Sequence, residues 1–173
     1  LEHFDLDVQD AIAADLGAST GGFTDCLLQR GASRVFAIDV GQGQLAWKLR
    51  TDERVVVMEK TNARHLKKVH LPSSINLIVV DCSFISLKHI LPPAVALLEQ
   101  SGSIVALIKP QFEAGKEEAD KGRGVIRDPI LHRQIIDSLE QFATEELPLK
   151  WKSVVESPLL GPAGNKEFLV WLE

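Results

Sequence analysis

Residues 11–24 read AIAADLGASTGGFT, and this stretch decides the fold class. A short apolar run reaches Asp15 and then passes directly into a turn that contains Gly17, Gly21 and Gly22. Glycines let a backbone turn tightly and approach a ligand closely. In Rossmann-like folds the nucleotide lies where the first strand turns into the first helix, so this stretch predicts a strand, a ligand-binding turn and a helix.

Further apolar runs follow along the chain, with helical stretches between them. Continuous apolar runs suit strands that are buried on both faces, as in a parallel sheet covered by helices. A turn-rich segment, 157–165, joins the last two runs and predicts a hairpin-like ending. We therefore expect an α/β, Rossmann-like domain with a seven-stranded, mostly parallel sheet, an antiparallel last strand and helices on both faces. The predicted strands are 11–16, 34–39, 55–58, 76–81, 103–109, 151–155 and 167–172.

The intervening segments predict the helices. We expect crossover helices at 22–30, 44–50 and 85–100. Asp128 is a typical N-cap followed by Pro129 at the first helical position, which predicts a long amphipathic helix that ends at about Glu146. The longest stretch without a pattern is 110–127, and a loop of that length inside a compact domain is usually functional or disordered.

Composition narrows the class of protein. The chain has 173 residues, 45% of them hydrophobic and 25% charged, which predicts one globular domain with a substantial core. Its two cysteines, Cys26 and Cys82, lack a C-x-x-C spacing, which favours a reducing cytosol over a disulfide framework or a zinc ribbon. The five histidines show no ligand spacing, so we expect no metal. The chain opens at Leu1 and not at Met, which favours a fragment of a longer protein.

Charge and hydropathy exclude further classes. No segment approaches the roughly 18 apolar residues of a membrane span. The first 29 residues contain no Lys or Arg, so we see no signal peptide. A net charge of −5 argues against a domain that binds nucleic acid by bulk electrostatics alone.

Spacing around the glycine turn indicates the ligand. Ser19 breaks the G-x-G-x-x-G fingerprint of dinucleotide sites, and no lysine follows as a Walker loop requires. Asp15 suits a ligand amino group better than a phosphate, and Asp39 lies where an acid accepts hydrogen bonds from ribose hydroxyls. These features favour S-adenosylmethionine, while a structural glycine turn with solvated acids stays open. The predicted cofactor-binding residues are Asp15, Gly17, Ser19, Gly21, Gly22, Phe23, Asp39, Val40, Asn62 and Asp81.

Four motifs resemble one family. They are DLGASTGGFT at 15–24, DVGQGQLAW at 39–47, DCSFISL at 81–87 and KPQFEAG at 109–115. In this order they resemble the TlyA family, FtsJ-like ribosomal RNA 2′-O-methyltransferases that also carry an older hemolysin label. The resemblance covers essentially the whole chain. It implies a class I methyltransferase fold, S-adenosylmethionine as cofactor, ribosomal RNA as partner, a cytoplasmic location and an S4-like RNA-binding domain upstream.

Three charged residues are the candidate catalytic groups. Asp81 and Lys109 end predicted parallel strands, and Glu167 begins the antiparallel last strand, so all three belong to one sheet edge. The resemblance implies a Lys-Asp-Lys-Glu tetrad in which they hold the second, third and fourth positions. No lysine precedes Lys48, so we expect the first member outside this chain. A simple loop cap at Asp81 and an exposed pair between Lys166 and Glu167 are the structural alternatives.

Basic residues suggest where RNA would lie. Lys116, Lys121, Arg123 and Arg127 make 110–127 a candidate substrate lid, although four acids share the loop. A second basic stretch, 64–70, could contact phosphate or be a solvated face. Against the methyltransferase hypothesis stand a membrane-acting hemolysin, a nicotinamide-dependent oxidoreductase and a cofactor-binding domain without catalysis.

Overall fold

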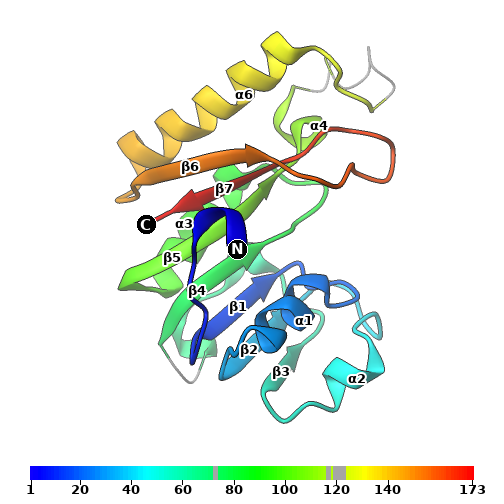
Figure 1. Ribbon diagram of the computed structural model, residues 1–173, viewed down its shortest axis with the longest axis vertical. Coiled ribbons are helices and arrows are strands. Elements are labelled where there is room, and N and C mark those ends of the chain that lie inside the picture. Colours follow the sequence, from blue (N-terminus) through cyan, green and yellow to red (C-terminus); the bar gives the residue numbers. More distant parts are fainter. Residues whose placement is uncertain (72–73, 116–117, 119–123) are drawn as a thin grey trace.

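Seven strands form one mixed sheet in the computed structural model, which describes residues 1–71, 74–115, 118 and 124–173 (Figure 1). The order is β3-β2-β1-β4-β5-β7-β6, and β7 runs antiparallel to both of its neighbours. Fold class and antiparallel ending are therefore confirmed. The strands are β1 (Ile12–Leu16), β2 (Arg34–Ile38), β3 (Val55–Met58), β4 (Ile75–Val80), β5 (Leu98–Ile108), β6 (Trp151–Glu156) and β7 (Phe168–Leu172).

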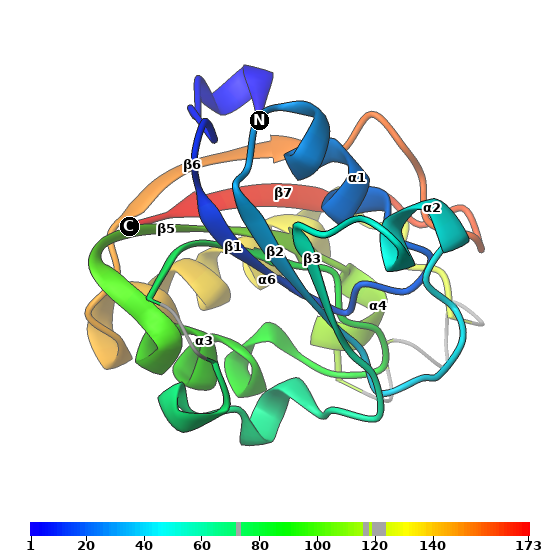
Figure 2. The same cartoon turned by 90° about the horizontal axis from the view of Figure 1, so that it is seen from below.

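Helices cover both faces of the sheet, as Figure 2 shows. Helices α1 (Gly22–Gln29) and α2 (Trp47–Arg50) pack on one face, together with the N-terminal segment that carries η1 (Glu2–Phe4). Helices α3 (Leu91–Leu97) and α6 (Pro129–Gln141) pack on the other face. Short turns complete the list: α4 (Pro110–Glu113), η2 (Ala63–His65), η3 (Lys68–His70), η4 (Leu87–His89) and the π-helical η5 (Phe142–Glu146).

Two predicted helices differ from the structure at their first turns. Gln44 to Ala46 are not helical, because Ala46 is extended and its N–H donates to the Thr20 carbonyl. The segment predicted as one helix at 85–100 divides into η4 and α3. Pro92 and Pro93 lie in the first turn of α3, where a missing N–H costs no helical hydrogen bond, and so they fix where that helix begins.

Strand β5 begins earlier than predicted. Leu98 to Gln100, expected at the end of a helix, belong to β5, and Leu98 pairs with Ile75 across a register irregularity in β4. Pairing with a neighbouring strand outweighs local helix preference here, because the backbone groups of Leu98 gain partners in the sheet. Helix α6 agrees with the prediction, since the π-helical turn η5 continues it to Glu146.

The carboxyl edge of the parallel strands carries the predicted site. Asp39 follows β2, Asp81 follows β4 and Lys109 follows β5. Ile108 is opposite Phe168 in the antiparallel β5–β7 pair, so Glu167 precedes β7 at the level of Lys109. Parallel topology therefore gathers side chains from four separate segments at one edge.

Candidate functional site

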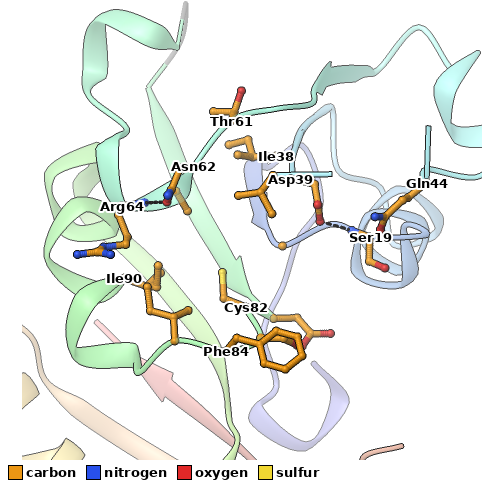
Figure 3. A pocket seen from close by; sticks show the side chains of 16 residues that line it. Ser19, Ile38, Asp39, Gln44, Thr61, Asn62, Arg64, Cys82, Phe84 and Ile90 are labelled. Carbon is orange, nitrogen blue, oxygen red and sulfur yellow. Dashed lines mark hydrogen bonds between the residues drawn. The ribbon is translucent and has the colours of Figure 1, made fainter. Parts of the chain in front are cut away.

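A cavity of about 420 Å³ lies at this edge, a size typical of small-molecule sites (Figure 3). Its walls come from the turns after β1, β2, β3 and β4 and from the start of α3. Asp39 and Ser19 lie close together, with Ile38 beside Asp39, whereas Ile90 lies on the far side of the cavity near Arg64 (Figure 3). The lining residues are Gly17, Ser19, Ile38, Asp39, Val40, Gln44, Thr61, Asn62, Ala63, Arg64, Asp81, Cys82, Ser83, Phe84, Ile85 and Ile90.

Asp39 organises the polar part of the cavity. One carboxylate oxygen accepts the N–H of Ser19 at 2.8 Å and the other accepts the N–H of Gly41 at 2.7 Å. These bonds fix the carboxylate between two turns, and each oxygen keeps a further lone pair. Asp39 can therefore still accept hydrogen bonds from ligand hydroxyls, as the sequence predicts.

Gly17 joins the turn after β1 to the turn after β4. Its φ is +88°, and a Cβ at this position would lie 2.6 Å from the Asp81 carbonyl oxygen. Only glycine allows this approach without strain or displacement. The close contact brings Asp81, whose N–H donates to the Leu16 carbonyl at 2.9 Å, to the cavity wall.

Four residues of the predicted cofactor set do not line the cavity: Asp15, Gly21, Gly22 and Phe23. Gly21 has a φ of +99°, and a Cβ there would lie 2.2 Å from a methyl of Leu49, so its small size serves helix packing. Gly22 begins α1, and Phe23 packs against the core on that side of the sheet. The geometry gives Gly21 and Phe23 a packing role and does not support direct cofactor contact at these positions.

Asp15 lies behind the cavity wall. It is fully buried, and one carboxylate oxygen accepts both the N–H and the hydroxyl of Thr24 at 3.0 and 2.7 Å. The other oxygen has no hydrogen-bond partner among the described residues. Burial raises the pKa of Asp15 to about 7. The position supports a link between the glycine turn and α1, and not the direct ligand contact that the sequence predicted.

Asn62 and Val40 reach the cavity as expected. The Asn62 side-chain oxygen accepts the Arg64 N–H at 3.0 Å and caps η2, so its amide N–H groups remain available to a ligand. Val40 is exposed at the rim. Cys82 and Phe84 also line the cavity, although neither was predicted as a cavity residue from the DCSFISL motif to which both belong.

Lys109 forms an ion pair with Asp81, which lines the cavity, although Lys109 itself is not a lining residue. The Lys109 Nζ lies 2.5 Å from Asp81 Oδ1 and donates to the Ser83 hydroxyl at 3.0 Å. The Lys109 side chain is 12% exposed, whereas that of Asp81 is 35% exposed and faces the cavity. Asp81 is therefore more than a loop cap, because its carboxylate orients a largely buried ammonium group.

Glu167 lies nearby but is not paired with Lys109. It is buried, and its Oε1 accepts the Gln111 side-chain amide at 3.2 Å. Within the described residues Lys109 forms no ion pair with Glu167. Lys166 instead pairs with Glu156 at 3.0 Å, which excludes the exposed Lys166–Glu167 pair. The structure thus joins two of the three predicted catalytic groups directly and adds Gln111 beside the third.

Phe84 is the most exposed large apolar side chain of the site. It is 90% exposed, although its backbone has a φ of +62°, a conformation that costs free energy in a residue with a side chain. Its ring centroid lies 5.0 Å from that of Phe112. An exposed aromatic ring beside an ion pair suits contact with a flat partner.

Three further findings concern candidate sites outside the cavity. No cluster of three or more His, Cys, Asp or Glu side chains that could hold a metal ion occurs in the described part of the chain. Among the described residues every helix is too short or too polar to cross a membrane. Of the four basic residues of the predicted lid, Lys116, Lys121 and Arg123 lie outside the described residues, and Arg127 is exposed.

Strand order, cavity position and the Asp39 turn define the class: a Rossmann-like, S-adenosylmethionine-dependent methyltransferase fold. A solved methyltransferase of this class from Listeria monocytogenes shares the fold with a TM-score of 0.72 at 16% identity, over 99% of this chain and 94% of that one. The chain belongs to the FtsJ-like methyltransferase family, whose profile matches residues 1–173.

Two similar proteins share far more of the sequence. One is a Mycobacterium tuberculosis protein named 16S/23S rRNA (cytidine-2′-O)-methyltransferase TlyA, 48% identical over 99% of this chain. The chain spans 63% of the length of that relative. The other is a solved Lactococcus lactis protein described as a hemolysin, with a TM-score of 0.96 at 48% identity, over 99% of this chain and 82% of that one. The predicted resemblance to the TlyA family is confirmed.

Proposed function

We propose that this chain is the catalytic domain of an enzyme that transfers a methyl group from S-adenosylmethionine to ribose 2′-hydroxyls of ribosomal RNA. The proposal rests on the ion pair between Lys109 and Asp81, whose carboxylate lines the cavity. The name of the M. tuberculosis relative supports the substrate class.

The residues of the cavity fit S-adenosylmethionine. Asp39 has free lone pairs for ribose hydroxyls, and Ile38 and Ile90 offer apolar surface to a purine. The Asp81 carboxylate places negative charge where a cationic ligand would be attracted. A phosphate group would find no basic cradle at the Gly17–Ser19 turn, which agrees with the broken dinucleotide fingerprint.

The residues of the chain prepare the acceptor oxygen for attack. When bound, S-adenosylmethionine supplies an electrophilic methyl group. Lys109, oriented by Asp81 and Ser83, would donate a hydrogen bond to the acceptor oxygen and stabilise the negative charge that develops on it. The hydroxyl proton would pass to solvent water, and the cofactor would leave as the neutral thioether S-adenosylhomocysteine. Holding the acceptor in line removes entropy from the barrier. Glu167, fixed by Gln111, would complete the polar edge.

We infer that residues outside this chain contribute part of the affinity for ribosomal RNA. The net charge of −5 supports little affinity from bulk electrostatics. Arg64 at the cavity and the exposed Lys67 and Lys68 could contact phosphates. We infer that an upstream S4-like domain supplies further affinity and the remaining lysine of the tetrad, and that the enzyme acts on ribosomes in the cytoplasm.

Methyl transfer by the full-length protein tests the proposal. Purified ribosomal subunits and radiolabelled S-adenosylmethionine are incubated with wild type and Lys109→Ala, and the site of label is mapped to ribose or base. We expect ribose methylation that falls at least 100-fold in Lys109→Ala, while calorimetric titration shows unchanged cofactor binding. Absence of ribose methylation by wild type, or binding of NAD and not of S-adenosylmethionine, would contradict the proposal.

The hemolysin description of the L. lactis neighbour motivates a second test. Dye-loaded liposomes are exposed to micromolar protein without cofactor. Methyl transfer without leakage supports the enzyme alone, whereas dye release that survives Lys109→Ala would establish a separate membrane activity.

A further inference from the structure

The loop 81–87 and the segment 109–113 are joined at several points. Asp81 and Ser83 both contact Lys109, the Phe84 ring lies tilted beside the Phe112 ring, and the far end of the loop contacts Glu113. The order of these contacts along the loop follows the order of their partners along the other segment. The ion pair is one end of a longer two-segment contact, and Glu113 is the other end.

Glu113 closes this contact with two hydrogen bonds. One carboxylate oxygen accepts the Ser86 hydroxyl at 2.6 Å and the other accepts the Leu87 N–H at 2.7 Å. Burial raises the pKa of Glu113, because removal from water disfavours the charged carboxylate. The hydrogen bonds from Ser86 and Leu87 offset part of this cost. The Ser86 oxygen also accepts the Lys88 N–H at 3.1 Å, which ties the start of η4 to the same carboxylate.

The strained backbone of the loop requires contacts that hold it in place. Phe84 holds a left-handed backbone conformation with its ring largely exposed, so neither local preference nor burial keeps it in place. The surrounding structure must hold such a residue. The Phe112 ring is one constraint, and the Glu113 bonds hold the Ser86 side chain and the Leu87 backbone, two and three residues after Phe84.

We propose that Glu113 is a positioning residue for methyl transfer, which holds the loop 81–87 so that Asp81 and Ser83 orient Lys109 and Phe84 faces the acceptor. The inference rests on the proposed function. Glu113 is absent from the cavity wall, and Asp39 and Asn62, which would bind the cofactor, are held by other contacts. Loss of Glu113 should therefore affect turnover and leave cofactor binding in place.

Steady-state kinetics of the full-length protein separate these effects. Glu113→Ala, Glu113→Gln and Ser86→Ala are compared with Glu99→Ala, a control that removes an exposed carboxylate near the opposite end of β5. We expect Glu113→Ala to lower kcat at least tenfold with KM for S-adenosylmethionine within threefold of wild type. Glu113→Gln, which can still accept from Leu87, should recover most of the loss, and Ser86→Ala should lie between them.

Amide hydrogen exchange provides a readout that does not depend on RNA. In Glu113→Ala, exchange should accelerate at Leu87 and Lys88 and remain unchanged in β4. Unchanged exchange in the loop, or a kcat within twofold of wild type, overturns the inference. A wild-type protein that methylates no ribosomal RNA overturns the proposed function and this role with it, whereas an active wild type with an equally active Glu113→Ala overturns this role alone.

Discussion

Gly17 and Asp81 touch through their backbones, because a Cβ on Gly17 would lie 2.6 Å from the Asp81 carbonyl oxygen. This contact joins the turn after β1 to the turn after β4, and the cavity opens beside it. The two strands are hydrogen-bonded neighbours, with Leu16 opposite Val80. The site therefore depends on how closely two adjacent strand ends can approach.

Gly17→Ala should destabilise the protein strongly. Alanine would have to adopt a φ of +88° and displace the Asp81 backbone, which we expect to cost about 2–4 kcal/mol of unfolding free energy. Gly22→Ala is the matched control, since a Cβ there meets nothing within 4 Å. Urea unfolding of both variants checks this, and similar midpoints for the two would contradict it.

Asp15→Asn should change how stability depends on pH. The pKa of Asp15 is raised to about 7 in the folded protein, so the folded state holds this proton more tightly than the unfolded state. Its contribution is fully present below about pH 4 and is lost as pH rises to about 7, by at most roughly 4 kcal/mol. Asparagine does not titrate. Between pH 4.5 and 7.5 the wild type should therefore lose more stability than Asp15→Asn, as measured by denaturant unfolding; equal losses would refute the assignment.

Asp39→Ala should weaken cofactor binding. The variant loses a carboxylate that can bond ribose hydroxyls and also frees the Ser19 and Gly41 N–H groups. We expect affinity for S-adenosylmethionine to fall about tenfold to hundredfold, since a hydrogen bond to a charged group contributes about 1.5–3 kcal/mol. Calorimetry measures the change, with the surface variant Asp25→Ala as control. Undiminished binding by Asp39→Ala would show that the ligand lies elsewhere.

Asn165→Ala should destabilise the protein, because it removes the contacts between the β6–β7 segment and residues 124–126. Its buried side chain accepts the Ile126 N–H and donates to the Gly124 carbonyl, both at 2.9 Å. Removing it leaves the buried Ile126 N–H unpaired, which costs about 1–3 kcal/mol. Asn76→Ala, which removes a more exposed bond to the Ile12 N–H at 3.0 Å, should cost less. Thermal unfolding compares the two, and a larger effect at Asn76 would contradict the role of burial.

Most of the fold could be predicted from local sequence patterns. Apolar runs marked β1 to β5 because a parallel sheet covered on both faces buries consecutive residues, whereas burial alternates along the antiparallel β7. The beginning of α6 could be predicted from Asp128 and Pro129, because an N-cap and a first-turn proline depend only on neighbouring residues. The helix predicted at Leu98 to Gln100 was wrong, because the strand conformation of this segment depends on pairing with β4, which lies more than twenty residues earlier in the chain.

For the site, the sequence by itself determined which acids and which lysine end the strands, and motif spacing named the family. Only the tertiary structure decided which of them meet: Lys109 pairs with Asp81, Glu167 bonds Gln111, and Asp15 turns away from the cavity to Thr24. The contacts of Glu113 and Phe84 were likewise decided only by the tertiary structure. Chain order follows from covalent bonds and local preference, whereas side-chain partners depend on distances between remote segments that arise only when the sheet is assembled.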